Sequence, residues 1–275
     1  MRDWGTSFAP SPPERAFPHL AIDGTSRSMA PPADPTLDAF HRGRFHLVQP
    51  RGGHRAGLDA LLLAASVPDG LAGDVLDMGA GTGLAGLATA DRHPLARVTL
   101  AERDPVTLAA LRASLDLPGN AGLAARARVV PVDLMAPAAS REAALGREAH
   151  DHALANPPFN SASHRSSPDA RRAGAHDMDG DTLAAWCRAA AAALRPGGSL
   201  TMIVRPASLS GLLAAWGGRF GGPALLPVHT REGPATRLLA RGAKGARAPL
   251  AMLPSLHVND AFARALADGT AQVAM

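Results

Sequence analysis

Short apolar runs recur along the central part of the chain, and longer stretches of mixed apolar and polar residues separate them. Such runs, bounded by glycine, proline or acidic residues, are typical of buried strands, whereas the longer stretches are typical of helices that cover a sheet. The strands are expected at residues 74–78, 97–102, 127–132, 152–155 and 199–204. This alternation predicts an α/β fold, a doubly wound sheet with helices on both faces.

The expected helices end at recognisable stop signals. Pro105 suits the first turn of a helix, and Arg195-Pro196-Gly197-Gly198 cannot continue one. The first helix is expected to end near residue 93. The others are expected at residues 105–117, 138–148, 181–194 and 207–219. Two further apolar stretches, 224–230 and 235–241, flank a turn sequence and predict a hairpin that brings the sheet to seven strands.

A glycine-rich turn follows the first expected strand. That strand ends at Asp77, and Gly79-Ala80-Gly81-Thr82-Gly83 then leads into a helix. Glycines permit a tight turn and let the backbone approach a ligand closely. The second strand ends at Glu102, 19 positions after Gly83, where nucleotide-binding folds place the acid that holds ribose hydroxyls. The glycine spacing differs from that of a dinucleotide fingerprint, so the pattern favours a different nucleoside cofactor.

A second motif ends the fourth expected strand. Asn156-Pro157-Pro158-Phe159 places an amide, two rigid prolines and an aromatic ring at the edge where open α/β sheets bind ligands. An amide oxygen can accept a hydrogen bond from a planar amino group while the ring stacks on its plane. The motif therefore predicts a pocket for an amino group that is to be alkylated.

Together these motifs resemble the class I S-adenosylmethionine-dependent methyltransferases with an N-P-P-[YF] motif. Within that group the chain is most similar to the bacterial tRNA1(Val) (adenine-37-N6)-methyltransferase family, over roughly residues 42–259. The resemblance implies a Rossmann-like seven-stranded sheet, transfer of a methyl group to an exocyclic amino group, and no metal. It implies that Asn156, Pro157, Pro158 and Phe159 carry the transfer. The implied cofactor contacts are Gly57, Asp59, Asp77, Gly79, Ala80, Gly81, Gly83, Glu102, Arg103, Asp133, Leu134 and Asn156.

Basic residues flank both motifs. The chain carries 27 arginines and one lysine, a formal net charge of +4 and a pI near 10.7. Net charge alone says little, but the clustering near the expected pocket suggests a surface that follows an RNA backbone. The expected RNA-binding residues are Arg42, Arg44, Arg51, Arg55, Arg165, Arg171 and Arg172.

The expected domain organisation has four parts: a proline-rich disordered extension at 1–40, a cap over the cofactor and substrate cleft at 41–70, the methyltransferase domain at 71–260, and a tail at 261–275. The single cysteine, Cys187, excludes an intramolecular disulfide and lies in an alanine-rich helix, where a buried structural role is expected. We expect a cytoplasmic monomer with no membrane segment.

The sequence indicates the type of reaction more clearly than the molecule that accepts the methyl group. Adenine N6 in RNA or DNA, guanine N2 in ribosomal RNA and the glutamine amide of release factors all suit an N-P-P-[YF] pocket. Phe159 replaces the tyrosine expected in the tRNA adenine family, and phenylalanine is common in the guanine group. The tRNA adenine assignment is favoured by Gly57-Leu58-Asp59 and by the ending Thr236–Gly245. A non-catalytic nucleotide- or RNA-binding module is the alternative outside enzymes.

Overall fold

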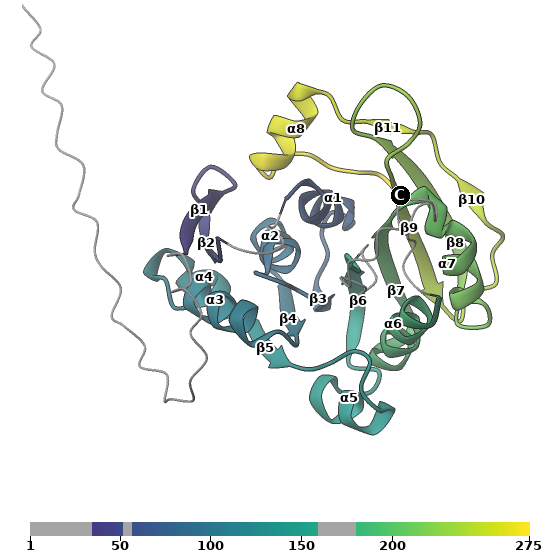
Figure 1. The fold of residues 1–275 in the computed structure, drawn as a ribbon, viewed down its shortest axis with the longest axis horizontal. Helices are drawn as coiled ribbons and strands as arrows, with labels where there is room; N and C mark the ends of the chain where they lie inside the picture. The colour runs from purple at the N-terminus through teal and green to yellow at the C-terminus, as the bar shows by residue number, and fades with distance from the viewer. Residues whose placement is uncertain (1–34, 52–56, 159–179) are drawn as a thin grey trace, which may run out of the picture. The chain divides into compact units, whose positions relative to one another are not determined.

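A computed structural model describes residues 35–51, 57–158 and 180–275, and these described residues belong to one compact unit (Figure 1). Its centre is a sheet of nine strands with the order β10-β8-β9-β7-β6-β3-β4-β5, and β11 pairs with β8 beside β10. The strands are β3 (Gly73–Met78), β4 (Ala96–Glu102), β5 (Ala127–Pro131), β6 (His150–Ala155), β7 (Leu194–Val204), β8 (Phe220–His229), β9 (Arg237–Lys244), β10 (Ala251–Met252) and β11 (Leu256–His257). Five neighbouring strands, from β5 to β7, are parallel, and β9 is antiparallel to both β7 and β8.

Alternation along the strands explains the two helical layers seen in Figure 1. On β3, Val75 belongs to one apolar core and Leu76 to the other, as successive side chains of a strand must. The helices of the first layer are α1 (Leu58–Ser66), α2 (Leu84–Arg92), α3 (Pro105–Leu115), α4 (Ala121–Ala124) and α8 (Asp260–Ala267). The helices of the second layer are α5 (Ala138–Leu145), α6 (Gly180–Ala193) and α7 (Leu209–Trp216). The predicted Rossmann-like α/β fold is confirmed, but the sheet has nine strands and not seven, because the two-residue strands β10 and β11 extend it beside β8.

Strand β7 begins five residues earlier than predicted. Leu194 pairs with His150, and the register then shifts before His152 meets Ser199. Gly197 adopts a positive φ of 78°, which lets the Pro-Gly-Gly sequence bulge inside the strand instead of forming a loop before it. The sequence signal marks the end of α6 at Ala193, but the strand resumes at once.

A strand lies inside the segment that was expected to be an extension ending at residue 40. Strand β1 (Thr36–Phe40) pairs with β2 (Phe45–Gln49) in a separate two-stranded sheet, and the rings of Phe40 and Phe45 stack with centroids 5.6 Å apart. This hairpin lies on α3, where the Ser114 hydroxyl accepts a hydrogen bond of 2.9 Å from the backbone N–H of Val48. The strand was missed in the sequence because it is short and follows several prolines, although its exposed and half-buried residues alternate.

The remaining domain expectations also differ from the structure at both ends of the main unit. Helix α1, expected within a cap, packs into the first core with Leu62 and Leu63 fully buried. The expected C-terminal tail contains most of α8, and the Val273 N–H donates to the carbonyl of Ala65 at 2.9 Å. Both segments are parts of one folded unit because each supplies buried apolar side chains to it.

Candidate active site

The parallel strands β3 to β7 all end at one edge of the sheet, which we call the carboxyl edge. Met78, the last residue of β3, lies beside Ala155, the last residue of β6. The chain therefore leaves the sheet at Gly79 and at Asn156 on adjacent strands, which lie about 5 Å apart in any sheet. The structure brings together the glycine loop and the Asn-Pro turn, although 72 residues separate them in the sequence.

The glycine loop, residues 79–83, has a backbone that other residues would strain. Gly79, Gly81 and Gly83 have φ values of 65°, 58° and 90°. A Cβ atom on Gly79 would lie 2.5 Å from the ring of Trp186 on α6, whereas a Cβ atom on Gly81 would meet nothing within 4 Å. Trp186 thus forms one wall of the loop, and the space over Gly81 is open.

This difference allows a matched comparison of two substitutions. Gly81→Ala adds only the backbone cost of a positive φ and is expected to lower the free energy of unfolding by about 1 kcal/mol. Gly79→Ala adds overlap with the Trp186 ring, so a loss of roughly 2–4 kcal/mol is expected. Chemical denaturation measures both, and Trp186→Leu should recover part of the Gly79→Ala loss. Equal destabilisation by the two alanines would show that Trp186 does not constrain the loop.

Glu102 connects the glycine loop to the end of β4. Its Oε2 accepts the N–H of Gly81 at 2.9 Å, and its Oε1 accepts the N–H groups of Arg103 and Asp104 at 2.7 and 2.8 Å. A carboxylate offers about four acceptor positions, so a ligand hydroxyl can still bind Oε2. Glu102 therefore lies where a ribose diol above the loop can be held.

Asp77 occupies a different place from the one expected. Its carboxylate is buried beneath the loop, and Oδ2 accepts the N–H of Gly86 in the first turn of α2 at 2.8 Å. The pKa of Asp77 is raised to about 7, mainly by burial, with the Gly86 hydrogen bond acting against that rise and the neighbouring Glu102 carboxylate adding to it. Asp77 thus supports the loop from below, and its expected contact with the cofactor stays a prediction.

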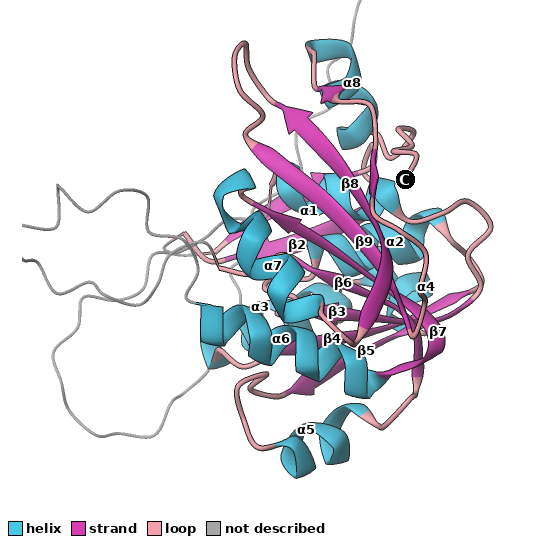
Figure 2. Cartoon of the chain, turned by 90° about the vertical axis from the view of Figure 1, so that its right-hand side faces the viewer, coloured by secondary structure: helices cyan, strands magenta, loops and turns pink. Residues whose placement is uncertain are grey.

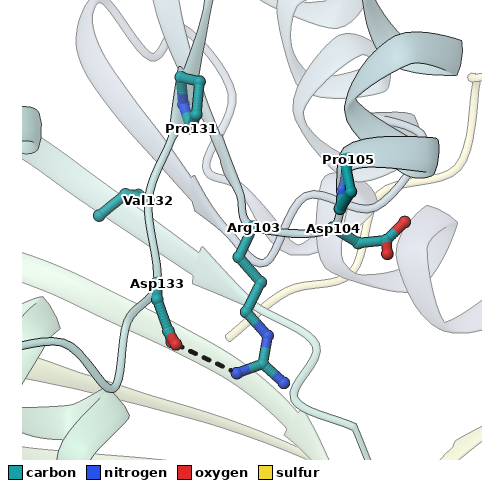
Figure 3. A pocket seen from close by; sticks show the side chains of 6 residues that line it. All are labelled: Arg103, Asp104, Pro105, Pro131, Val132 and Asp133. Atoms are coloured by element: carbon teal, nitrogen blue, oxygen red, sulfur yellow. Dashed lines mark hydrogen bonds and ion pairs between the residues drawn. The ribbon is translucent and has the colours of Figure 1, made fainter. Parts of the chain in front are cut away.

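A hollow of about 590 Å³ lies between the ends of β4 and β5 (Figure 3). It is lined by Arg103, Asp104, Pro105, Pro131, Val132 and Asp133. Arg103 and Asp133 face each other in an ion pair of 3.3 Å, and both are well exposed, so the pair contributes little to stability. Proline and valine side chains suit a flat ring, and Asp133 can accept hydrogen bonds from it. Leu134, also expected in the site, is buried beside this hollow.

Asn156 follows β6 directly, and its Oδ1 atom is buried without a hydrogen-bond partner. Buried amide oxygens are nearly always satisfied, and leaving one unpaired costs about 1–3 kcal/mol. Pro157 is buried and Pro158 exposed, so the turn is anchored on one side. The unpaired acceptor beside the glycine loop is what a site for an N–H donor requires. Phe159 lies outside the described residues.

Gly57 and Asp59 begin α1, with Gly57 as the N-terminal cap residue. Both oxygens of Asp59 accept from Nε of Arg237, at 2.8 and 3.0 Å. Because Arg237 starts β9 beside the end of β7, this ion pair fixes the start of α1 at the carboxyl edge. Asp59 is thus close to the expected cofactor region but is already bound to an arginine.

The two basic residues of the β1–β2 turn lie elsewhere. Arg44 binds Asp91 through three hydrogen bonds of 2.6–3.1 Å, and Arg42 binds Asp268 at 2.6 Å. Asp91 ends α2 a few residues before β4 begins, so Arg44 lies at the opposite edge of the sheet from Asn156. These two expected RNA contacts instead hold the hairpin to the domain. Arg51 is exposed, and Arg55, Arg165, Arg171 and Arg172 lie outside the described residues.

Several residues at the carboxyl edge were missed in the sequence. Trp186 gives no local signal, because only the fold places it against Gly79. Thr82, inside the loop, has a buried Oγ1 without a partner, which makes it a second candidate to contact a ligand. Arg205 directly follows β7, and Arg237 is the first residue of β9. Both could have been found by examining polar residues at the ends of apolar runs, which is how Glu102 was located.

The described residues contain neither a candidate metal site nor a helix that could span a membrane. No set of three or more histidine, cysteine, aspartate or glutamate side chains in this part of the chain could hold a metal ion. Within the same residues, no helix has the length and apolar character needed to cross a membrane. Cys187 is fully buried, which confirms its structural interpretation, and burial raises the pKa of its thiol to about 12.

Comparisons with known proteins agree with the geometry. Over 170 residues the chain is 32% identical to the tRNA1(Val) (adenine(37)-N6)-methyltransferase of Porphyromonas gingivalis, an alignment that spans 60% of this chain and 64% of that protein. The crystal structure of a predicted O-methyltransferase from Agrobacterium tumefaciens is 35% identical, with a TM-score of 0.66 over 79% of this chain and 99% of that one.

A third similarity shows the fold alone. The structure of TYW2 from M. jannaschii in complex with AdoMet is 10% identical, with a TM-score of 0.51 over 81% of this chain and 90% of that one. The family model for the methyltransferase small domain matches residues 56–210, more than half of the chain, and includes the glycine loop and the Asn-Pro turn. The chain therefore belongs to the methyltransferase small domain family.

Proposed function

We propose that this protein transfers a methyl group from S-adenosylmethionine to an exocyclic amino group, and that its acceptor is adenine N6 in tRNA. The observation that supports this most strongly is the buried, unpaired Oδ1 of Asn156 beside the glycine loop. An amino group would supply the missing donor, so acceptor binding would remove an unfavourable feature of the free protein. Family membership supports the methyl donor.

The residues of the carboxyl edge fit this cofactor. Glu102 retains acceptor capacity for ribose hydroxyls, the hollow beside Asp133 can hold the adenine ring, and the open backbone over Gly81 allows close approach. S-adenosylmethionine, when bound, supplies an electrophilic methyl group on a positively charged sulfonium. The short separation of Gly79 and Asn156 would then place donor and acceptor on adjacent strand ends, and such positioning accounts for much of the acceleration in transfer reactions.

The acceptor nitrogen needs help that Asn156 can give. Its lone pair is delocalised into the ring, and it would become tetrahedral as its bond to the methyl carbon forms and the bond from that carbon to sulfur breaks. The products would be neutral S-adenosylhomocysteine and a cationic nitrogen that loses one N–H proton to water. Hydrogen bonds from the amino group to Asn156 Oδ1 and to the Pro157 carbonyl favour that change, because both strengthen as positive charge develops on nitrogen. We propose that Phe159 stacks on the base.

An oxygen acceptor fits less well, although the Agrobacterium relative is titled a predicted O-methyltransferase. A hydroxyl must lose its proton to become a good nucleophile, and an amide side chain does not act as a base at neutral pH. The Porphyromonas relative favours adenine in tRNA. Guanine N2 of ribosomal RNA is the second candidate, since Phe159 is common in that group, and the glutamine amide of release factors is the third.

One experiment separates these acceptors from each other and from a non-catalytic binding module. The protein is incubated with methyl-labelled S-adenosylmethionine and, separately, with total tRNA, ribosomal RNA, DNA and a release factor. We expect label in tRNA alone. Label in another acceptor would reassign the substrate, and label in none would favour the binding module. We further propose that the protein acts as a monomer in the cytoplasm, where this tRNA pool is found.

Removal of the proposed ribose contact should weaken cofactor binding. Glu102→Ala removes an acceptor for the ligand and leaves the Gly81 N–H unpaired, so the Kd for S-adenosylmethionine should rise by roughly 10–100-fold, as expected when a charged hydrogen-bond partner is lost. Glu102→Gln keeps an acceptor and should lose less. Calorimetry measures both, and an unchanged Kd in the alanine variant would reject the assignment.

A further inference from the structure

A second hollow, of about 450 Å³, lies at the carboxyl edge where β8 turns into β9. It is lined by Arg205, Thr230, Arg231, Pro234, Ala235, Thr236 and Arg237. Three of these seven residues are arginines, and none is acidic. The turn 230–236 extends beyond the sheet at the upper left of Figure 2, and residues 231–234 in it are exposed.

This hollow lies close to the proposed transfer site. β6 neighbours β7, β7 neighbours β9, and Val204 at the end of β7 pairs with Leu238. Arg205 therefore leaves the sheet one strand from Asn156, and Arg237 lies two strands away, a lateral distance of about 10 Å. That separation suits a nucleotide in the site with its flanking phosphates on the hollow.

The chemistry of the lining suits phosphate. Guanidinium groups bind phosphate oxygens in pairs of parallel hydrogen bonds. The hydroxyls of Thr230 and Thr236 share a hydrogen bond of 2.8 Å across the turn, and that of Thr236 also donates to the Val228 carbonyl at 3.4 Å, so the arginines are the phosphate donors of this hollow. Asp59 holds Arg237 in place and offsets its charge. Arg205 and Arg231 are exposed and add positive charge to the hollow, and the exposed Glu232 acts against it.

We propose that this arginine-lined hollow binds phosphate groups of the RNA strand on either side of the target nucleotide. The inference rests on the proposed function, because it assumes an RNA acceptor in the neighbouring site. It replaces the β1–β2 turn as the basic surface, since Arg42 and Arg44 are used in ion pairs there and Arg44 lies at the far edge. Phosphate contacts of this kind position a nucleic acid without reading its sequence.

The test is direct binding of total tRNA, measured at several salt concentrations without cofactor. Arg231→Ala and Arg205→Ala should each weaken binding by roughly threefold to tenfold and lower the salt slope by about 1, as expected for one lost phosphate contact. Arg231→Lys should keep most of the affinity, and Glu232→Gln should strengthen binding. The matched control is Arg247→Ala, an exposed arginine just beyond the opposite end of the same hairpin.

Methyl transfer provides the second measurement. Arg231→Ala should raise the KM for tRNA and leave kcat and the Kd for S-adenosylmethionine unchanged. Arginine variants that bind tRNA as Arg247→Ala does, in a protein that still labels tRNA, would overturn the phosphate surface alone. Arginine-dependent tRNA binding without any labelled RNA would support the surface and refute the proposed function. A wild-type protein that binds no RNA would overturn both.

Discussion

Replacement of Asn156 by alanine is expected to lower kcat by about 10² or more and to leave the Kd for S-adenosylmethionine nearly unchanged. Loss of one preorganised hydrogen-bond group that acts on the transition state typically has this effect. Asn156 Oδ1 is unpaired in the free protein, so its removal breaks no contact that holds the fold. Single-turnover rates with saturating cofactor measure the chemical step directly.

The contrary result for Asn156→Ala is equally clear. A variant that binds the cofactor poorly but turns over normally once saturated would show that Asn156 holds S-adenosylmethionine and does not act on the amino group. Circular dichroism and the midpoint of thermal unfolding provide the control for folding. The circular dichroism spectrum should match that of the wild type, and the unfolding midpoint should be at least as high, because an unsatisfied buried oxygen destabilises the native state.

The second large effect is the change in the free energy of unfolding with pH that the buried carboxyl of Asp77 should cause. Its pKa is about 7 in the folded protein against a normal value of 3.8, so the folded state binds its proton more strongly than the unfolded chain does. The stability associated with that proton is fully present below about pH 4 and is lost as the pH rises through about 7. A shift of this size corresponds to roughly 4 kcal/mol.

Asp77→Asn removes this titration and keeps an oxygen for the Gly86 N–H. The difference in unfolding free energy, variant minus wild type, should therefore increase by roughly 4 kcal/mol between about pH 4 and pH 8. His152 contributes the opposite trend, because burial lowers its pKa to about 3, but it is present in both proteins and cancels in the difference. Urea denaturation at each pH gives these values.

Asp74, at the other end of β3, is the matched control. The guanidinium of Arg97 lowers the pKa of Asp74 despite its partial burial. Stability from Asp74 is present above its normal pKa of 3.8 and is lost as the pH falls below it, so the difference for Asp74→Asn should be nearly constant from pH 4 to pH 8 and should rise only as the pH falls below about 4. A flat profile for Asp77→Asn would show that its carboxyl is not buried in solution.

Much of the sheet could be predicted from the sequence, because the parallel strands are buried on both faces and read as nearly continuous apolar runs. The end of each run located Glu102, Asp133 and Asn156, and parallel strands place such ends at one edge. The site was therefore predictable to the extent that it consists of strand ends.

The rest depended on contacts between segments far apart in the chain. Asp77 lies under the loop because α2 packs so that the Gly86 N–H reaches its carboxylate. No local sequence pattern indicates this position. The basic residues around Arg44 in the sequence are typical of a nucleic-acid contact. In the structure, however, Arg44 binds Asp91, 47 residues away, at the edge of the sheet opposite Asn156. The basic turn at Arg231 was interpreted only as a hairpin connection, since its neighbours Arg205 and Arg237 come from other strand ends.

The central claim is that Asn156 directs a methyl group from S-adenosylmethionine to an amino nitrogen of RNA. Its most direct test is mass spectrometry of nucleosides from tRNA that has been labelled by the protein. We expect the label in N6-methyladenosine and expect Asn156→Ala to abolish most of it. A label on ribose oxygen, or an N6-methyladenosine yield that Asn156→Ala leaves unchanged, would contradict the claim.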